Sequence, residues 1–252
     1  MGKNKYKRFQ ENLTFDCMVQ PDFNDIFHKD HPLKGEWAQR QFANENPLVL
    51  ELGCGRGEYT VDLAKAEGSK NFIGVDIKGA RMWRGAKTAT EQGIQNAAFL
   101  RTRIEFIESF FAAQEVSEIW ITFPDPQLKK GRALKRLTSP RFLERYARFL
   151  KAGGIIHLKT DSQHLHEYTK SLLECNGITP IASNNDIYGS GFADPVLSIK
   201  TTYEAKFLGQ GLPITYLSWQ LPEGVEQFKS PLFEADEQEG TLDDNRPPVP
   251  RS

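Results

Sequence analysis

The feature that most restricts the fold is a short apolar run that ends in a glycine-rich turn. Residues 48–52 read Leu-Val-Leu-Glu-Leu, and Gly53, Gly55 and Gly57 follow directly. An apolar run of this length, bounded by glycines, indicates a buried strand. The glycines let the backbone turn sharply and approach a ligand without a Cβ in the way. With a helix expected from about Glu58, this region predicts the first unit of an α/β site for a nucleotide-type ligand.

Strands and helices are expected to alternate after this turn. The expected strands are 71–76, 97–100, 118–123 and 155–159, and helical stretches are expected around 80–89, 141–150 and 164–175. Ser139 and Pro140 resemble the N-cap and first position of the helix that follows them. Such alternation predicts a parallel sheet with helices on both faces. After Gly177 the pattern becomes more β-like, and 203–208 and 214–221 are expected to be closing strands.

The chain is long enough for one α/β domain with extensions, since it has 252 residues. We expect an N-terminal extension over residues 1–45, the main domain over 46–222, and an acidic, proline-containing tail over 223–252 that is disordered. Hydrophobic residues make up 39% and charged residues 26%, which is typical of a globular protein.

Several classes of protein are excluded by simple patterns. No apolar run approaches the roughly 20 residues that cross a bilayer, and residues 1–20 lack the apolar core of a signal peptide. Cys17, Cys54 and Cys175 are too far apart to predict a disulfide framework or a zinc site, which favours a cytoplasmic protein. The histidines form no ligand pattern with nearby carboxylates or cysteines, so we predict no metal.

The charge pattern leaves room for only a local nucleic-acid contact. The formal net charge is -1, which argues against a surface coated with basic residues. One short stretch is nevertheless basic, through Lys129, Lys130, Arg132, Lys135, Arg136 and Arg141. A run of this kind suits phosphate contacts. It can also be an ordinary solvated face, and its position close to Asp125 favours the phosphate interpretation.

Two acidic residues flank the glycine turn in a way that suits a cationic ligand. Glu51 precedes the glycines, and Asp76 ends the next strand, where it can accept hydrogen bonds from ribose hydroxyls. A dinucleotide-binding turn would place its third glycine at the position of Glu58 and would not welcome Glu51 beside a pyrophosphate. S-adenosylmethionine carries a sulfonium and an amino group, so we favour it over a dinucleotide. An ordinary glycine turn is the remaining alternative.

A rigid acidic loop is expected where the fourth strand ends. Pro124 and Pro126 flank Asp125 and fix an extended backbone around it. A carboxylate held this way can receive the N1 and exocyclic N2 hydrogens of a guanine. The guanine N7 has a free lone pair and no proton, so alignment with a methyl donor would suffice without a general base. Alternatively, Asp125 caps a turn. Asp161 likewise follows a strand, and it could either face the site or cap the next helix.

Together these motifs resemble the bacterial tRNA (guanine-N7-)-methyltransferase family, over roughly residues 48–217. The matching segments are Glu51-Leu52-Gly53-Cys54-Gly55, Gly74-Val75-Asp76, Phe123-Pro124-Asp125-Pro126, Lys135-Arg136-Leu137-Thr138-Ser139-Pro140-Arg141-Phe142, Lys159-Thr160-Asp161 and Thr201-Thr202-Tyr203-Glu204. The Thr-Ser-Pro-Arg-Phe run after Pro-Asp-Pro is highly specific.

The resemblance implies a class I methyltransferase fold, which is a Rossmann-like, mostly parallel sheet of seven strands. It implies methyl transfer from S-adenosylmethionine to N7 of guanine 46 in the variable loop of tRNA, without a membrane, a metal or an obligate protein partner. The cofactor-binding residues would be Glu51, Gly53, Gly55, Asp76, Arg103 and Asp125, of which Asp125 would also be catalytic. The substrate-binding residues would be Lys129, Asp161, Thr201, Thr202, Tyr203 and Glu204.

The chain departs from the family at two positions. Gln127 stands where the family usually has Trp after Pro-Asp-Pro, and Arg103 stands where an acidic residue usually lies beside the adenine. Arg103 could stack on an adenine but cannot accept its amino hydrogens. Two alternative functions therefore stay open at this point, a noncatalytic tRNA-binding protein with this fold and a methyltransferase for a small molecule.

Overall fold

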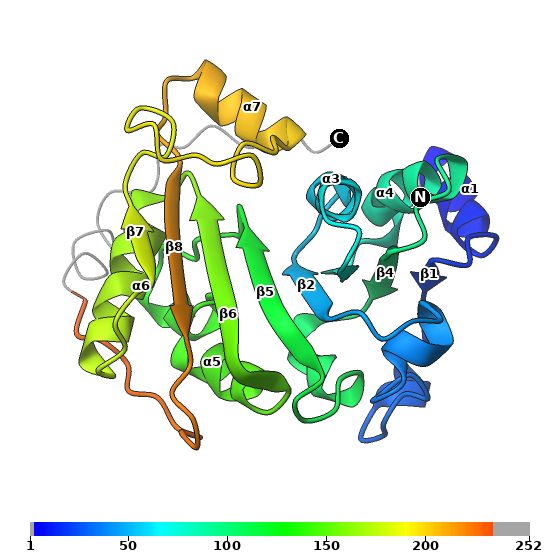
Figure 1. The fold of residues 1–252 in the computed structure, drawn as a ribbon, viewed down its shortest axis with the longest axis horizontal. Coiled ribbons are helices and arrows are strands. Elements are labelled where there is room, and N and C mark those ends of the chain that lie inside the picture. The colour runs from blue at the N-terminus through cyan, green and yellow to red at the C-terminus, as the bar shows by residue number, and fades with distance from the viewer. Residues whose placement is uncertain (1–2, 234–252) are drawn as a thin grey trace.

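A computed structural model gives the fold and describes residues 3–233 (Figure 1). The helices are α1 (Lys3–Asn12), α2 (Phe23–Ile26), η1 (Trp37–Gln41), α3 (Glu58–Ala66), α4 (Gly79–Glu91), η2 (Ile104–Ser109), η3 (Lys130–Lys135), α5 (Pro140–Ala147), α6 (Gln163–Cys175) and α7 (Thr202–Gly209). The strands are β1 (Met18–Val19), β2 (Leu48–Leu52), β3 (Asn71–Asp76), β4 (Ala97–Arg101), β5 (Val116–Thr122), β6 (Leu150–Thr160), β7 (Ala182–Asn184) and β8 (Thr215–Gln220).

The described strands form one mostly parallel sheet in the order β1-β4-β3-β2-β5-β6-β8-β7, in which β8 runs antiparallel to both of its neighbours. The α/β class is confirmed, but the count is eight strands rather than seven. Two of the described strands were not expected, β7 and, in the N-terminal segment, β1, whereas the expected strand 203–208 is a helix. β1 pairs with β4 in parallel, with Met18 opposite Phe99 and Val19 opposite Leu100, so this segment belongs to the sheet.

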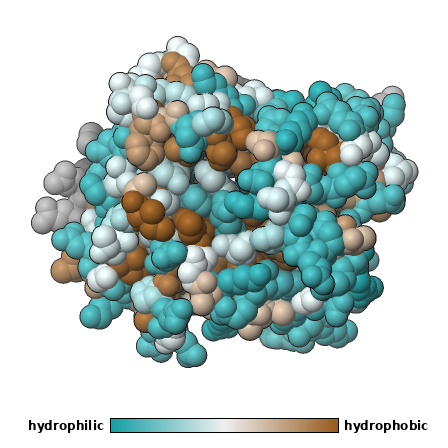
Figure 2. Space-filling view, viewed as in Figure 1, coloured by the Kyte–Doolittle hydropathy of each residue, from teal (hydrophilic) through white to brown (hydrophobic). Residues whose placement is uncertain are grey.

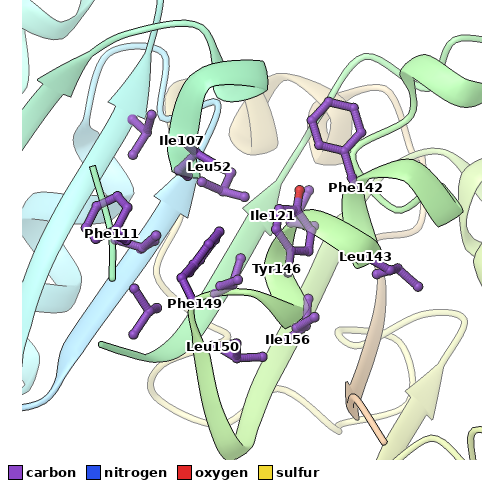
Figure 3. Close-up of a cluster of buried hydrophobic side chains, with 14 of the residues drawn as sticks. Leu52, Ile107, Phe111, Ile121, Phe142, Leu143, Tyr146, Phe149, Leu150 and Ile156 are labelled. Atoms are coloured by element: carbon purple, nitrogen blue, oxygen red, sulfur yellow. The ribbon is translucent and has the colours of Figure 1, made fainter. Parts of the chain in front are cut away.

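Alternate residues of the strands point to opposite faces of the sheet and contribute to two separate hydrophobic cores. On one face Leu50 and Leu52 pack with residues of α5 and α6, and Figure 3 shows part of this cluster around Tyr146 and Phe149. On the other face Val49 packs with residues of α3 and α4. This alternation explains why the strands read as apolar on both sides, and it confirms the expected helical layers on both faces.

Two expectations about the C-terminal part are wrong. Residues 203–208 lie in helix α7, because Thr201 caps the helix by accepting a hydrogen bond from the Glu204 amide at 3.1 Å. Residues 223–233 were expected to be disordered, yet Phe228 is buried against the core and the Lys229 amide donates to the Asn176 side chain at 2.7 Å. The acidic residues of the expected tail, from Glu234 on, lie outside the described residues.

The surface shown in Figure 2 is mostly hydrophilic, with hydrophobic residues confined to separate small groups. Within residues 3–233, no helix combines the length and the hydropathy that a bilayer span requires.

Candidate active site

The candidate site lies where the parallel strands end. β2, β3, β5 and β6 all run in the same direction, so the residues after them meet at one edge of the sheet (Figure 1). This edge carries the glycine turn, Asp76, Asp125 and Asp161. Ligands of open α/β sheets bind at such an edge, close to the point where the strand order reverses. Here β2 lies at that reversal, between β3 and β5.

The glycine turn is shaped by left-handed backbone angles. Gly53, Gly55 and Gly57 have φ values of 79°, 56° and 71°, which residues with a Cβ rarely adopt. The amides of Gly53 and Cys54 donate to the Val75 carbonyl at 2.8 and 3.1 Å, so the turn is fixed to the end of β3. A Cβ on Gly57 would lie 2.4 Å from Cε1 of Phe99. The turn is thus a tightly packed backbone cradle.

Glu51 is a buried carboxyl directly before this turn. It accepts hydrogen bonds from the hydroxyls of Thr60 on α3 and of Thr122 on β5, the latter at 2.6 Å. Burial raises the pKa of Glu51 to about 7, although both hydroxyls act to lower it. A cationic group bound beside Glu51 would favour its ionised form, and this arrangement fits the amino and sulfonium groups of S-adenosylmethionine.

Asp76 is partly exposed at the end of β3 and is oriented by the backbone. Its Oδ2 accepts from the Gly55 amide at 3.0 Å, and its Oδ1 accepts from the Lys78 amide at 2.7 Å. Each carboxylate oxygen can accept a further hydrogen bond. Asp76 can therefore receive the two hydroxyls of a ribose while staying attached to the glycine turn.

Asp125 lies on a loop with unusual backbone geometry. Phe123 and Gln127, on either side of it, have φ values of 47° and 48°, and such conformations often occur at functional sites. The Phe123 amide donates to the Lys159 carbonyl at 2.9 Å, which ties the loop to β6. The Asp125 side chain is exposed, and its Oδ1 accepts from the Gln127 amide at 3.0 Å. Asp125 thus caps a turn and also presents its carboxylate at the edge.

Arg136 corrects the interpretation of the basic stretch. Its side chain is fully buried and not available to a phosphate. The guanidinium donates to the carbonyls of Pro126 and Gln127 at 3.1 and 3.0 Å, and it lies 4.2 Å from the centre of the Tyr168 ring. Arg136 therefore holds the Asp125 loop in place. The basic residues of the stretch that are exposed are Lys129, Lys130, Arg132, Lys135 and Arg141.

Lys129 and Asp161 are both placed at the expected edge. Lys129 is exposed and directly precedes η3, and Asp161 is partly exposed directly after β6. The cap of α6 is Ser162, whose hydroxyl accepts from the Leu165 amide at 3.2 Å. Asp161 is therefore not the cap of this helix, which was the alternative to a position facing the site.

The segment from Thr201 to Glu204 lies over the glycine turn but is only partly exposed. The Thr202 amide and hydroxyl donate to the Glu58 carboxylate at 2.9 and 2.8 Å, which joins α7 to the start of α3. Thr202 and Tyr203 are exposed. Glu204, in contrast, is fully buried and paired with Lys159 at 2.8 Å. In this structure a direct substrate contact by Glu204 would require that ion pair to open.

The Lys159–Glu204 pair was not foreseen from the sequence. The Lys159 ammonium also donates to the carbonyls of Leu197 and Ile199, at 2.6 and 3.0 Å, so it fastens the chain before α7 to the centre of the sheet. Burial lowers the pKa of Lys159, and the Glu204 carboxylate counteracts that shift. The sequence does contain a signal for this pair, because Lys159 continues an apolar strand. A lysine in such a position is buried only when it has a charged or polar partner.

Arg103 follows β4 and is exposed beside a cavity of about 230 Å³, which it lines together with Ile77 and Phe106. A second, larger cavity of about 900 Å³ is lined by Gln114, Leu150 and Leu221 among others, so it lies at the opposite end of the strands from Asp76. The described residues contain no group of three or more histidine, cysteine or acidic side chains arranged to hold a metal.

Comparisons with solved structures agree with the fold. A crystal structure of the 16S rRNA methyltransferase KamB matches with a TM-score of 0.57 and 16% identity, over 77% of this chain and 96% of that one. A 16S rRNA (adenine(1408)-N(1))-methyltransferase from Catenulisporales acidiphilia matches with a TM-score of 0.52 and 17% identity, over 73% of this chain and 91% of that one. At these identities the likeness shows the class I methyltransferase fold.

Comparisons with known sequences identify the family. A family model described as "Putative methyltransferase" matches residues 45–217. A relative from Christiangramia forsetii named tRNA (guanine-N(7)-)-methyltransferase is 52% identical, over 87% of this chain and 99% of the relative. A relative of the same name from Bacteroides thetaiotaomicron is 51% identical, over 94% of this chain and 93% of the relative. The chain belongs to the tRNA (guanine-N7-)-methyltransferase family.

Proposed function

We propose that this protein transfers the methyl group of S-adenosylmethionine to N7 of the variable-loop guanine 46 of tRNA. The observation that carries the proposal is the placement of the Asp125 loop beside the acid-lined glycine turn, on adjacent strands β5 and β2. Family membership supports this enzyme over a noncatalytic tRNA-binding protein and over a small-molecule methyltransferase. It also supports the cytoplasm as the site of action.

The residues around the glycine turn fit the cofactor. Gly53 and Gly55 leave the backbone open to a ligand, Asp76 would receive the ribose hydroxyls, and the Glu51 carboxylate would lie near the cationic methionine end. When bound, S-adenosylmethionine supplies an electrophilic methyl carbon on a positively charged sulfur. Because the turn and Asp76 are fixed to each other before binding, little ordering is required of the protein.

Asp125 would orient the guanine rather than act as a base. Its exposed carboxylate can accept hydrogen bonds from N1–H and the N2 amino group, and this would turn N7 toward the methyl carbon. N7 forms the new C–N bond with its own lone pair, the sulfur retains the electrons of the broken C–S bond, and no proton has to move. The main contribution of the protein is therefore alignment, for which the buried Arg136 keeps the Asp125 loop rigid.

The rest of the tRNA would be held by residues that flank this edge. Exposed Lys129, with Arg132 and Lys135, offers cations to the phosphates next to the target guanine. Asp161, Thr201, Thr202 and Tyr203 would contact the nucleotide from the other side. Glu204 would act indirectly, because it holds Lys159 and with it the segment before α7.

The test is methyl transfer to a tRNA transcript with a labelled donor, followed by mapping of the modified base. We expect label on one variable-loop guanine, and none when 7-deazaguanine replaces that guanine, since N7 is then absent. The Asp125→Ala variant should lose at least about a hundredfold in turnover while it binds the cofactor as the wild type does in calorimetry. Label on the 7-deazaguanine transcript, or wild-type turnover by the variant, would overturn the proposal.

A further inference from the structure

The cavity beside Arg103 is placed where the base of an adenosine ligand would lie. It is lined by Ile77, which directly follows Asp76, and by Thr102 and Arg103, which directly follow β4. The Thr102 amide donates to the Asp76 carbonyl at 3.1 Å, so the cavity adjoins the proposed ribose position. Its volume of about 230 Å³ lies below the roughly 300–1,000 Å³ of sites for whole drug-sized ligands, so it suits one part of a ligand.

The walls of this cavity include large apolar side chains that the described chain covers only in part. Ile77 and Phe23 are 51% and 52% exposed. Phe106 lies edge-on to Phe23, with ring centres 5.6 Å apart. A flat aromatic base placed against these side chains would bury their exposed faces and gain hydrophobic free energy.

The polar groups of the cavity include one suitable acceptor. Adenine presents an exocyclic amino group, which needs an acceptor, and Arg103 has only donors. Asp22 also lines the cavity, its side chain is exposed, and it makes no capping hydrogen bond to the short helix α2 that follows it. Arg101 and Arg103 line the same cavity.

The fold explains how a residue so early in the chain reaches the cofactor edge. β1 runs parallel to β4, so its carboxyl end points to the same edge as Asp76, and Asp22 follows it within one short loop. The Asn12 side chain donates to the Gly79 carbonyl at 2.9 Å, which fixes the preceding helix to the start of α4. After Asp22, Ile26 is buried in the core, and the His31 amide donates to the Ser109 carbonyl at 2.8 Å.

We propose that Asp22 accepts the exocyclic amino hydrogens of the cofactor's adenine, and that Asp22 and Phe23 form the outer wall of the adenine site. This inference rests on the proposed use of S-adenosylmethionine. It gives the N-terminal segment a direct part in cofactor binding. The acceptor then comes from the N-terminal segment and not from Arg103, whose side chain has only donors.

The test compares two ligands by calorimetry, S-adenosylhomocysteine and its inosine counterpart, in which a carbonyl replaces the amino group. The wild type should prefer the adenine ligand by roughly tenfold or more, since a carboxylate repels that carbonyl. Asp22→Ala should weaken adenine binding by roughly tenfold and bring the preference close to one. Asp22→Asn should bind both ligands about equally, because its amide can accept from an amino group or donate to a carbonyl.

The matched control is Asp25→Ala. Asp25 is an exposed residue of helix α2, which directly follows Asp22, and it does not line the cavity. This variant should keep both the affinity and the preference of the wild type. If the wild type binds the adenine ligand and Asp22→Asn keeps the full preference for it, the inference is wrong while the proposed function stands. If the wild type binds neither ligand, both the proposed function and this inference fail.

Discussion

The two halves of the active edge are built in different ways. The cofactor half, from β2 to β4, is shaped by backbone, through a turn of left-handed glycines in which the Gly53 and Cys54 amides donate to the Val75 carbonyl. The guanine half, from β5 to α7, is shaped by buried charged side chains, namely Arg136 beneath the Asp125 loop and Lys159 paired with Glu204. At Gly57 of the turn an added Cβ would clash with Phe99, whereas at the ion pair the loss of one partner leaves the other charge buried. The two halves should therefore respond to opposite kinds of substitution.

The largest effect is expected on the guanine half. Lys159→Met leaves Glu204 buried without its partner, and such removals cost about 3–5 kcal/mol in the free energy of unfolding. Urea denaturation measures the loss. Lys151→Met, an exposed position on the same strand, is the control and should change stability by less than about 0.5 kcal/mol. A similarly small change in the free energy of unfolding for Lys159→Met would show that the ion pair does not stabilise this half of the site.

A smaller effect is expected when a side chain is added to the cofactor half. Gly57→Ala places a Cβ 2.4 Å from the Phe99 ring at a φ of 71°, and overpacking of this kind costs about 1–3 kcal/mol. Gly93→Ala is the matched control, since its φ of 64° is similar and nothing lies within 4 Å. The same denaturation experiment separates the two causes. Equal losses for both variants would mean that backbone angle alone, and not close packing, selects glycine at this turn.

The smallest effect concerns Glu51, which lies on β2 and is hydrogen-bonded to Thr122 on the neighbouring strand β5. Its pKa of about 7 is raised above the usual value, so stability from the neutral form is full at low pH and is lost as the pH rises through about 7. Because a cationic cofactor favours the carboxylate, cofactor affinity should increase about tenfold from pH 6 to pH 8. Calorimetry at both pH values tests this, and Glu51→Gln should show a clearly weaker dependence. Identical profiles for the two proteins would exclude Glu51 as the titrating group.

The sequence was most informative where backbone requirements select residue types. Glycines and an apolar run located β2 and the turn correctly, and Ser139 with Pro140 marked the start of α5. Charged side chains were harder to interpret, because neighbours in sequence do not reveal that Arg136 is buried while Lys135 is exposed. The burial depends on Tyr168 and on the carbonyls of the Asp125 loop, which only the fold brings together.

One helix signal was present in the sequence, but the residue types around it favoured a strand. Thr201-Thr202-Tyr203-Glu204 has the spacing of a helix capping box, and the β-branched and aromatic residues there favoured a strand instead. β1 has only two residues, so its pairing with β4 depends on a tertiary contact that no local pattern records. The assignment of individual cofactor and substrate contacts stays a prediction that the experiments above address.

The short strand β1 also covers part of the outer edge of β4. β4 reads Ala-Ala-Phe-Leu-Arg, and without β1 its outer row of amide and carbonyl groups would be unpaired beside an apolar sequence. Edges of this kind recruit strands from other chains. We therefore expect a protein shortened to the domain boundary at residue 46 to expose this unpaired strand edge and to aggregate more readily than the full chain. The N-terminal segment thus covers an edge of the sheet that would otherwise be open.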